Sequence, residues 1–162
     1  MLIMRQSNGI LEENKKIKGA KEVVFEDIKF KSRLEMACYK KFQEAGLNFS
    51  YEPEKVILWE GFKPSSIQIY SPKKEGRGSY RGNLEIQEKK LLNVTYTPDF
   101  VVTKDKCKIY LDVKGMPNDT YPIKKKLFLK VLEERNDGYT YLFIEPHNIR
   151  QINQAIDLIK NL

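Results

Sequence analysis

The stretches TYTPDFVV, residues 95–102, and IYLDVKG, residues 109–115, decide the fold of this chain. Each is an apolar run that charged residues interrupt. Between them lies the short polar segment TKDK, residues 103–106. This pattern predicts two strands that pair antiparallel through a tight turn. A pair of strands that only filled a core would not need charges at these positions, so the stretches also raise a functional question.

Strand geometry predicts where those charges point. Side chains alternate between the two faces of a strand, so Asp112 and Lys114 share a face with Tyr110. If the two strands pair through the turn, Asp99 lies near Asp112. Two carboxylates that close together repel each other and are tolerated when a divalent cation lies between them. A lysine beside them can orient a water molecule or offset charge on a phosphate, and this set suits phosphodiester hydrolysis.

The composition sets the class of protein. The chain has 162 residues, of which 41% are hydrophobic and 31% charged, and this predicts a single globular domain with a substantial core. No apolar run approaches the roughly 20 residues of a membrane span. No signal-peptide pattern is visible, and Cys38 and Cys107 stand alone, so we expect a cytoplasmic protein. The net charge of +7 favours a polyanionic partner such as nucleic acid.

The order of patterns predicts an α/β (α+β) fold around a mixed sheet. We expect an N-terminal arm over residues 1–20 and one domain over 21–162. Within that domain the elements expected are strand-like residues 22–30, a helix over 32–46, a strand at 56–59, a basic β-hairpin insertion over about 60–92, the central strand pair, a helix within 118–135 on Ile123, Leu127 and Val131, a buried strand over 138–146 and a helix over 148–162.

Two basic groups are candidate DNA contacts. The tip of the expected hairpin is rich in glycine and cations, and a lysine run opens the helix that follows the second strand. A charged run on a helix is also a common solvated face, and a glycine-rich tip is also a common solvent-exposed loop, so both interpretations stay open. The candidate DNA-binding residues are Lys73, Lys74, Arg77, Arg81, Lys124, Lys125 and Lys126.

The central motif resembles the signature of the PD-(D/E)XK nuclease superfamily. The matching residues are Pro98-Asp99 and then Asp112-Val113-Lys114. Together with FEDIKFKSRLEMACYKKF and DVKGMPNDTYPIKKKLF, the chain is similar over roughly residues 20–130 to small phage-encoded endonucleases, some of which are Holliday-junction resolvases. Asp112 stands where glutamate is frequent in the superfamily.

The resemblance implies a restriction-endonuclease-like core and a Mg²⁺- or Mn²⁺-dependent endonuclease. Asp99, Asp112 and the carbonyl of Val113 would hold the metal, and Lys114 would act on the attacking water or the transition state. It implies DNA as the substrate, cleavage that is selective for branched or junction DNA in phage DNA metabolism, a homodimer as a common assembly, and the host cytoplasm as the location. The alternatives are an inactive nucleic-acid-binding module with the same fold, and a sequence-specific nuclease of restriction or transposase type.

Glu35 has two interpretations. By the resemblance it is the acidic residue of the first helix and either completes the metal site or holds a second ion. By its local sequence, Ser32 to Glu35 form an S-x-x-E capping box, in which the glutamate serves the start of the helix. Asp99 and Asp112 have a structural alternative too, since they can cap turns or pair with lysines such as Lys114.

Overall fold

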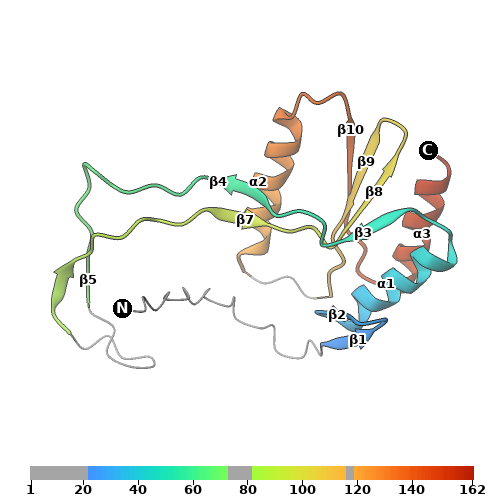
Figure 1. The fold of residues 1–162 in the computed structure, drawn as a ribbon, viewed down its shortest axis with the longest axis horizontal. Coiled ribbons are helices and arrows are strands. Elements are labelled where there is room, and N and C mark those ends of the chain that lie inside the picture. Colours follow the sequence, from blue (N-terminus) through green and yellow to red (C-terminus); the bar gives the residue numbers. More distant parts are fainter. Residues whose placement is uncertain (1–21, 73–81, 116–118) are drawn as a thin grey trace, which may run out of the picture.

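The computed structural model describes residues 22–72, 82–115 and 119–162 (Figure 1). The expected N-terminal arm lies outside the described residues. The same is true of four candidate DNA contacts in the hairpin tip, namely Lys73, Lys74, Arg77 and Arg81.

A four-stranded mixed sheet forms the centre of the molecule. Its strands are β3 (Phe49–Tyr51), β8 (Phe100–Lys104), β9 (Cys107–Leu111) and β10 (Thr140–Ile144), in the order β10-β9-β8-β3. β8 is antiparallel to both β3 and β9, whereas β10 runs parallel to β9. The predicted α+β fold with a mixed sheet is confirmed.

Helices cover both faces of this sheet (Figure 1). The first face packs against α1 (Arg33–Glu44) and α3 (Ile149–Lys160), with Phe42, Phe100 and Ile159 fully buried between them. The second face packs against α2 (Tyr121–Glu134) through Tyr110 and Phe128. Each strand of the central pair therefore contributes alternate side chains to two different cores, as the alternation of its sequence predicts.

Local signals set the ends of two helices. Ser32 caps α1, because its hydroxyl accepts a hydrogen bond from the Glu35 N–H. Gly46 follows the end of α1 with φ +69°, a conformation that favours glycine. Asn148 caps α3 by accepting from the Gln151 N–H. Both helices lie within one to two residues of their predicted ranges.

The strand-like residues 22–30 form two strands instead of one. β1 (Val23–Phe25) and β2 (Ile28–Phe30) pair antiparallel around Glu26 and Asp27. These two residues have φ values of +49° and +60°, as a two-residue hairpin turn requires.

The stretch around Pro98 and Asp99 is also divided, because two separate strands lie on either side of these residues. Here the prediction of one continuous strand is wrong. Val94–Tyr96 forms β7, which pairs with β4 (Val56–Trp59) in a separate two-stranded sheet. The chain resumes as β8 only at Phe100. Pro98 lies in the break and is fully buried. Since proline has no N–H to give to a ladder, it ends the first strand and sets the position of the second.

Beyond β4 and β7 the two chain segments continue together as a long ribbon that reaches away from the sheet and helices (Figure 1). We call residues 57–72 and 82–94 the extended hairpin. The Leu91 N–H donates to the Phe62 carbonyl at 2.8 Å, and the outer strands β5 (Tyr70–Pro72) and β6 (Leu84–Ile86) pair antiparallel. The predicted hairpin insertion is thus present, and its outer strands β5 and β6 are three residues long each.

Two details of the apolar pattern differ from prediction. β10 is an edge strand, and none of its residues is buried, because only β9 pairs with it. Ile123 is 61% exposed, while Tyr121, Phe128 and Leu132 are the buried residues of α2.

None of the helices in the described ranges has the length and apolar character needed to cross a bilayer.

Candidate functional site

The register of the central hairpin brings the two predicted aspartates together. Phe100 pairs with Leu111, so Asp99 and Asp112 are the next residues opposite each other, just past the ends of β8 and β9. The Lys114 ammonium bridges them, with Nζ at 3.0 Å from Asp112 Oδ1 and 3.9 Å from Asp99 Oδ2. The predicted convergence of Asp99, Asp112 and Lys114 is therefore present in the structure.

The two carboxylates are buried and poorly satisfied. Asp99 is 4% exposed and Asp112 is fully buried. Asp99 Oδ2 accepts a hydrogen bond from the Val113 N–H at 2.7 Å. Among the residues that the structure describes, no hydrogen bond of full geometry reaches the carboxylate of Asp112, and its near neighbours are the Lys114 ammonium, at 3.0 Å from Oδ1, and the hydroxyls of Tyr96 and Tyr121. A buried acceptor without a partner costs free energy, so this arrangement calls for a further positive or donating group.

The charges of the cluster act on each other. Burial, followed by the negative charge of Asp112, raises the pKa of Asp99 well above its ordinary value, against the opposing effect of Lys114. Burial alone would lower the pKa of Lys114, but the charges of Asp99 and Asp112 outweigh it and raise that pKa. The site thus holds more negative charge than one ammonium group balances.

Aromatic and acidic side chains from other elements surround Lys114. Its Nζ lies 4.9 Å from the ring centroid of Tyr121, a cation–π distance. The Tyr121 hydroxyl donates to Glu145 Oε2 at 2.7 Å, and the Lys125 ammonium pairs with the same oxygen. The charge of Asp112 contributes, after burial, to the raised pKa values of Tyr121 and Tyr96.

Sequence reasoning did not include Tyr96, Tyr121 or Glu145 in the site. They come from β7, α2 and the residue after β10, so their positions depend on tertiary packing. One signal was available for Glu145, which directly follows the apolar run of a strand that lies parallel to β9. Parallel strands end at the same edge of a sheet, and Glu145 therefore lies at the edge that carries Asp112.

Glu35 is held by the start of its helix. It is 6% exposed, and its Oε1 accepts from the Ser32 hydroxyl at 2.8 Å. Its Oε2 accepts from the Lys31 N–H at 3.2 Å and from the Tyr51 hydroxyl at 2.9 Å. The capping interpretation is confirmed, with the Lys31 N–H in place of the Ser32 N–H that a capping box uses. The Glu35 charge still contributes to the raised pKa of Asp99.

The lysine run at the start of α2 divides into two kinds of residue. Lys125 is engaged with Glu145 and belongs to the surroundings of the site. Lys126 is exposed, and Lys124 is half-buried. Lys126 is thus the member of the run best placed to meet a partner from solution.

A family model described as "Protein of unknown function (DUF1064)" matches residues 15–141 of the chain. The chain belongs to this DUF1064 family. The match includes Glu35, Asp99, Asp112 and Lys114 together with the extended hairpin, and it ends before α3. No curated protein and no solved structure matches the chain.

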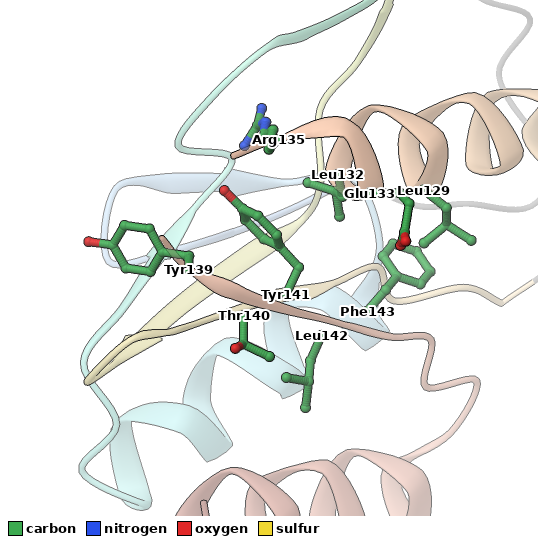
Figure 2. A pocket seen from close by; sticks show the side chains of 9 residues that line it. All are labelled: Leu129, Leu132, Glu133, Arg135, Tyr139, Thr140, Tyr141, Leu142 and Phe143. Atoms are coloured by element: carbon green, nitrogen blue, oxygen red, sulfur yellow. The ribbon is translucent and has the colours of Figure 1, made fainter. Parts of the chain in front are cut away.

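A shallow cavity of the DUF1064 chain lies apart from the acidic cluster. It has a volume of about 410 Å³ and lies between the end of α2 and the edge strand β10 (Figure 2). Leu129, Arg135, Tyr141 and Phe143 are among its walls, and no residue of the acidic cluster lines it. The buried pair of carboxylates, which one ammonium group does not balance, is a stronger indication of a chemical site than this open cavity.

The donor set of the DUF1064 chain fits a hard divalent cation. Within the described ranges, no three histidine, cysteine, aspartate or glutamate side chains gather as a complete metal cage. Mg²⁺ does not require such a cage, since it commonly uses one or two carboxylates and keeps several water ligands. Asp99 and Asp112 provide two carboxylates, and the Asp112 oxygens, which besides the Lys114 contact have no hydrogen bond of full geometry in the described ranges, are acceptors that such an ion would use.

The excess negative charge predicts that the DUF1064 chain becomes more stable when one carboxylate is neutralised. We expect Asp99→Asn to raise the melting temperature in metal-free buffer by about 2–6 °C, corresponding to about 1–2 kcal/mol. The amide oxygen still accepts from the Val113 N–H, and Asp112 still pairs with Lys114. Calorimetry with EDTA present measures the change.

The matched control for this prediction is Asp105→Asn. Asp105 is exposed in the turn between β8 and β9, with φ +52°, a conformation that asparagine tolerates. We expect its melting temperature to stay within a degree or so of wild type, since surface changes usually cost under about 0.5 kcal/mol. A fall in the melting temperature of Asp99→Asn would show that the charged pair stabilises the metal-free fold.

Proposed function

We propose that this chain is a metal-dependent DNA endonuclease that hydrolyses phosphodiester bonds by water attack. The observation that carries the proposal is the buried Asp99–Asp112 pair, in which the oxygens of Asp112 have no well-formed hydrogen bond in the described structure. A protein keeps such a costly arrangement where a bound cation offsets it. The resemblance of these residues to the PD-(D/E)XK signature, and a restriction-endonuclease-like core, are part of the same proposal.

Asp99, Asp112 and the Val113 carbonyl would hold Mg²⁺ or Mn²⁺. When bound, the ion supplies a Lewis acid that polarises a phosphate oxygen and acidifies a water ligand. The Val113 N–H fixes Asp99 in place through its 2.7 Å hydrogen bond, and this leaves the other Asp99 oxygen for the ion. Glu35, whose two oxygens are engaged by α1 and its neighbours, would contribute negative charge from a distance.

Lys114 would hold the attacking water or offset the charge that develops on the phosphate. Its side chain is 23% exposed, the most accessible part of a cluster whose carboxylates are almost fully buried. The negative charges beside it keep it protonated, as stabilisation of an anionic transition state requires. Tyr121 would act as a positioning residue, since its ring faces the Lys114 ammonium and its hydroxyl is fixed by Glu145.

DNA is the substrate that the charge of the chain favours. The net charge of +7 attracts a polyanion, and Lys126 is exposed at the start of the helix that carries Tyr121. Within this class we propose a phage-type enzyme that selects branched or junction DNA and works as a homodimer in the host cytoplasm. A restriction- or transposase-type nuclease would share the chemistry and differ in reading sequence instead of DNA shape.

The second candidate is a nucleic-acid-binding module without turnover. The 3.0 Å contact between Lys114 and Asp112 favours it, because a lysine can satisfy a buried aspartate as a structural ion pair. In that case the cluster would stabilise the fold, and metal ions would change neither DNA binding nor the melting temperature.

A cleavage assay tests the leading proposal. It compares a four-way junction, a linear duplex and single-stranded DNA, each with Mg²⁺, Mn²⁺ or EDTA. We expect metal-dependent cutting that is fastest on the junction. Asp112→Asn and Lys114→Gln should each lower the rate by about 10²-fold or more, because the first removes a ligand of the metal ion and the second removes the charge beside the reacting phosphate.

Asp105→Asn is the control for this assay, since Asp105 belongs to the same hairpin but lies at its opposite end. It should cut at the wild-type rate. Circular dichroism of every variant excludes unfolding as the cause of lost cutting. Tight DNA binding without cutting under either metal would favour the second candidate and overturn the enzyme proposal.

The two kinds of lysine at the start of α2 give a third prediction. Lys126→Gln should weaken DNA binding and lower the slope of log affinity against log salt by about 1, without changing the melting temperature. Lys125→Gln should lower the melting temperature, because it breaks the contact with Glu145. Fluorescence anisotropy at several salt concentrations and thermal unfolding provide the two measurements. Equal salt slopes for wild type and Lys126→Gln would remove Lys126 from the DNA interface.

A further inference from the structure

The extended hairpin exposes an unusual amount of apolar surface. Trp59 is 60% exposed, Leu84 is 68% and Leu92 is 80%. Ten large apolar side chains of the extended hairpin are exposed in the structure: Ile57, Trp59, Phe62, Ile67, Tyr70, Leu84, Ile86, Leu91, Leu92 and Val94. Soluble monomers rarely expose a large apolar patch, and such patches commonly mark interaction surfaces.

The outer part of this hairpin also lacks support from the rest of the fold. β5 and β6 form a two-stranded sheet of their own, and all three residues of β6 are exposed. An isolated two-stranded hairpin is only marginally stable in water. Figure 1 shows this part of the ribbon far from the central sheet and the helices. A partner that packs on it would stabilise it.

We propose that the extended hairpin is a self-association surface, on which two copies of this chain pack hairpin against hairpin as a dimer. The inference does not depend on the proposed nuclease activity, because it rests on the exposed apolar side chains of residues 57–72 and 82–94 and on their charge.

The charge of the hairpin stem, residues 57–72 and 82–94, favours a protein over DNA as the occupant of the stem. The stem contains three lysines (Lys63, Lys89 and Lys90) and three glutamates (Glu60, Glu85 and Glu88), so its formal net charge is zero. The excess cations of the hairpin belong to residues 73–81 between the two halves of the stem, where Lys73, Lys74, Arg77 and Arg81 stand against Glu75. A surface for DNA would carry excess cations. A neutral apolar ribbon can meet its own copy without like-charge repulsion.

The distribution of exposed apolar side chains indicates which part of the second copy the hairpin packs against. It favours the hairpin of that copy over its other surfaces. The other exposed large apolar residues in the described ranges are scattered over β1, α2, α3 and their flanking segments, and include Val24, Ile123 and Leu158. The hairpin is the place where they concentrate. A two-fold dimer buries the same patch on both copies, the commonest arrangement among homo-oligomers.

The apolar area of the ribbon approaches that of one side of a dimer interface. At about 200 Å² for an aromatic side chain and about 100 Å² for an aliphatic one, the ten side chains expose about 700 Å² of apolar area in total over both faces of the ribbon. A standard interface buries about 800 Å² on each partner, including its polar rim. The open edges of β5 and β6 add unpaired backbone groups, through which two ribbons can form a wider sheet.

Sedimentation equilibrium tests the inference, on nuclease-treated protein in high salt so that DNA cannot bridge two copies. We expect wild type to have twice the monomer mass of 19.0 kDa, with a dissociation constant of about 1 µM or tighter. Leu84→Lys/Leu92→Lys should weaken the dimer by about 100-fold or more, because it places charges in the apolar interface.

Val24→Lys/Leu158→Lys is the matched control. It adds the same charge at two exposed apolar positions outside the hairpin and should leave the dimer intact. Thermal unfolding of both double variants confirms that their cores are unchanged. A monomeric wild type at concentrations of about 100 µM would overturn the inference, since interfaces of this size bind far more tightly. Open-ended polymers would overturn the two-fold arrangement, and a dimer that survives the hairpin variant would place the interface elsewhere.

Discussion

The structure depends on one electrostatic constraint, namely that two buried carboxylates face each other across the central hairpin with a single ammonium group between them. Asp99 and Asp112 are held there by the register of β8 and β9, and Lys114 balances only one of their two charges. Burial makes the imbalance expensive, because solvent cannot screen it. The apolar burial in the two cores stabilises the fold and offsets this cost. We infer that a divalent cation supplies the missing positive charge, and that the protein keeps the unfavourable pair of carboxylates because the pair binds this ion.

Local patterns were sufficient to predict much of this arrangement. The side-chain alternation around Asp112, together with the short turn before Cys107, predicted both the antiparallel pairing and the shared face of Asp112 and Lys114. Those features follow from the two-residue period of a strand. The helix that begins after Ser32 and the helix after Asn148 were predicted for a similar reason, because caps and apolar spacing act within one or two turns.

Features that depend on distant contacts were not predictable in this way. The division of the run before Asp99 at Pro98 required knowing that Val94–Tyr96 pairs with β4, more than 30 residues earlier. Tyr121 and Glu145 join the surroundings of Lys114 only because α2 and β10 pack beside β9. The apolar exposure of the extended hairpin was likewise not predictable, since the pattern that indicates a hairpin does not say whether another part of the fold covers it. In each case the deciding neighbour is remote in sequence, and periodicity carries no information about it.

Calorimetric titration of the metal-free protein with Mn²⁺ tests the central claim most directly, since it measures the ion and not the reaction. The account predicts saturable binding that Asp112→Asn abolishes and that Lys114→Gln retains, because the lysine offsets charge and ligates nothing. Binding of Mn²⁺ to wild type and Asp112→Asn with equal affinity, or no binding to wild type, would contradict it. The buried pair would then be a structural ion pair with Lys114, and the fold would carry its cost for another reason.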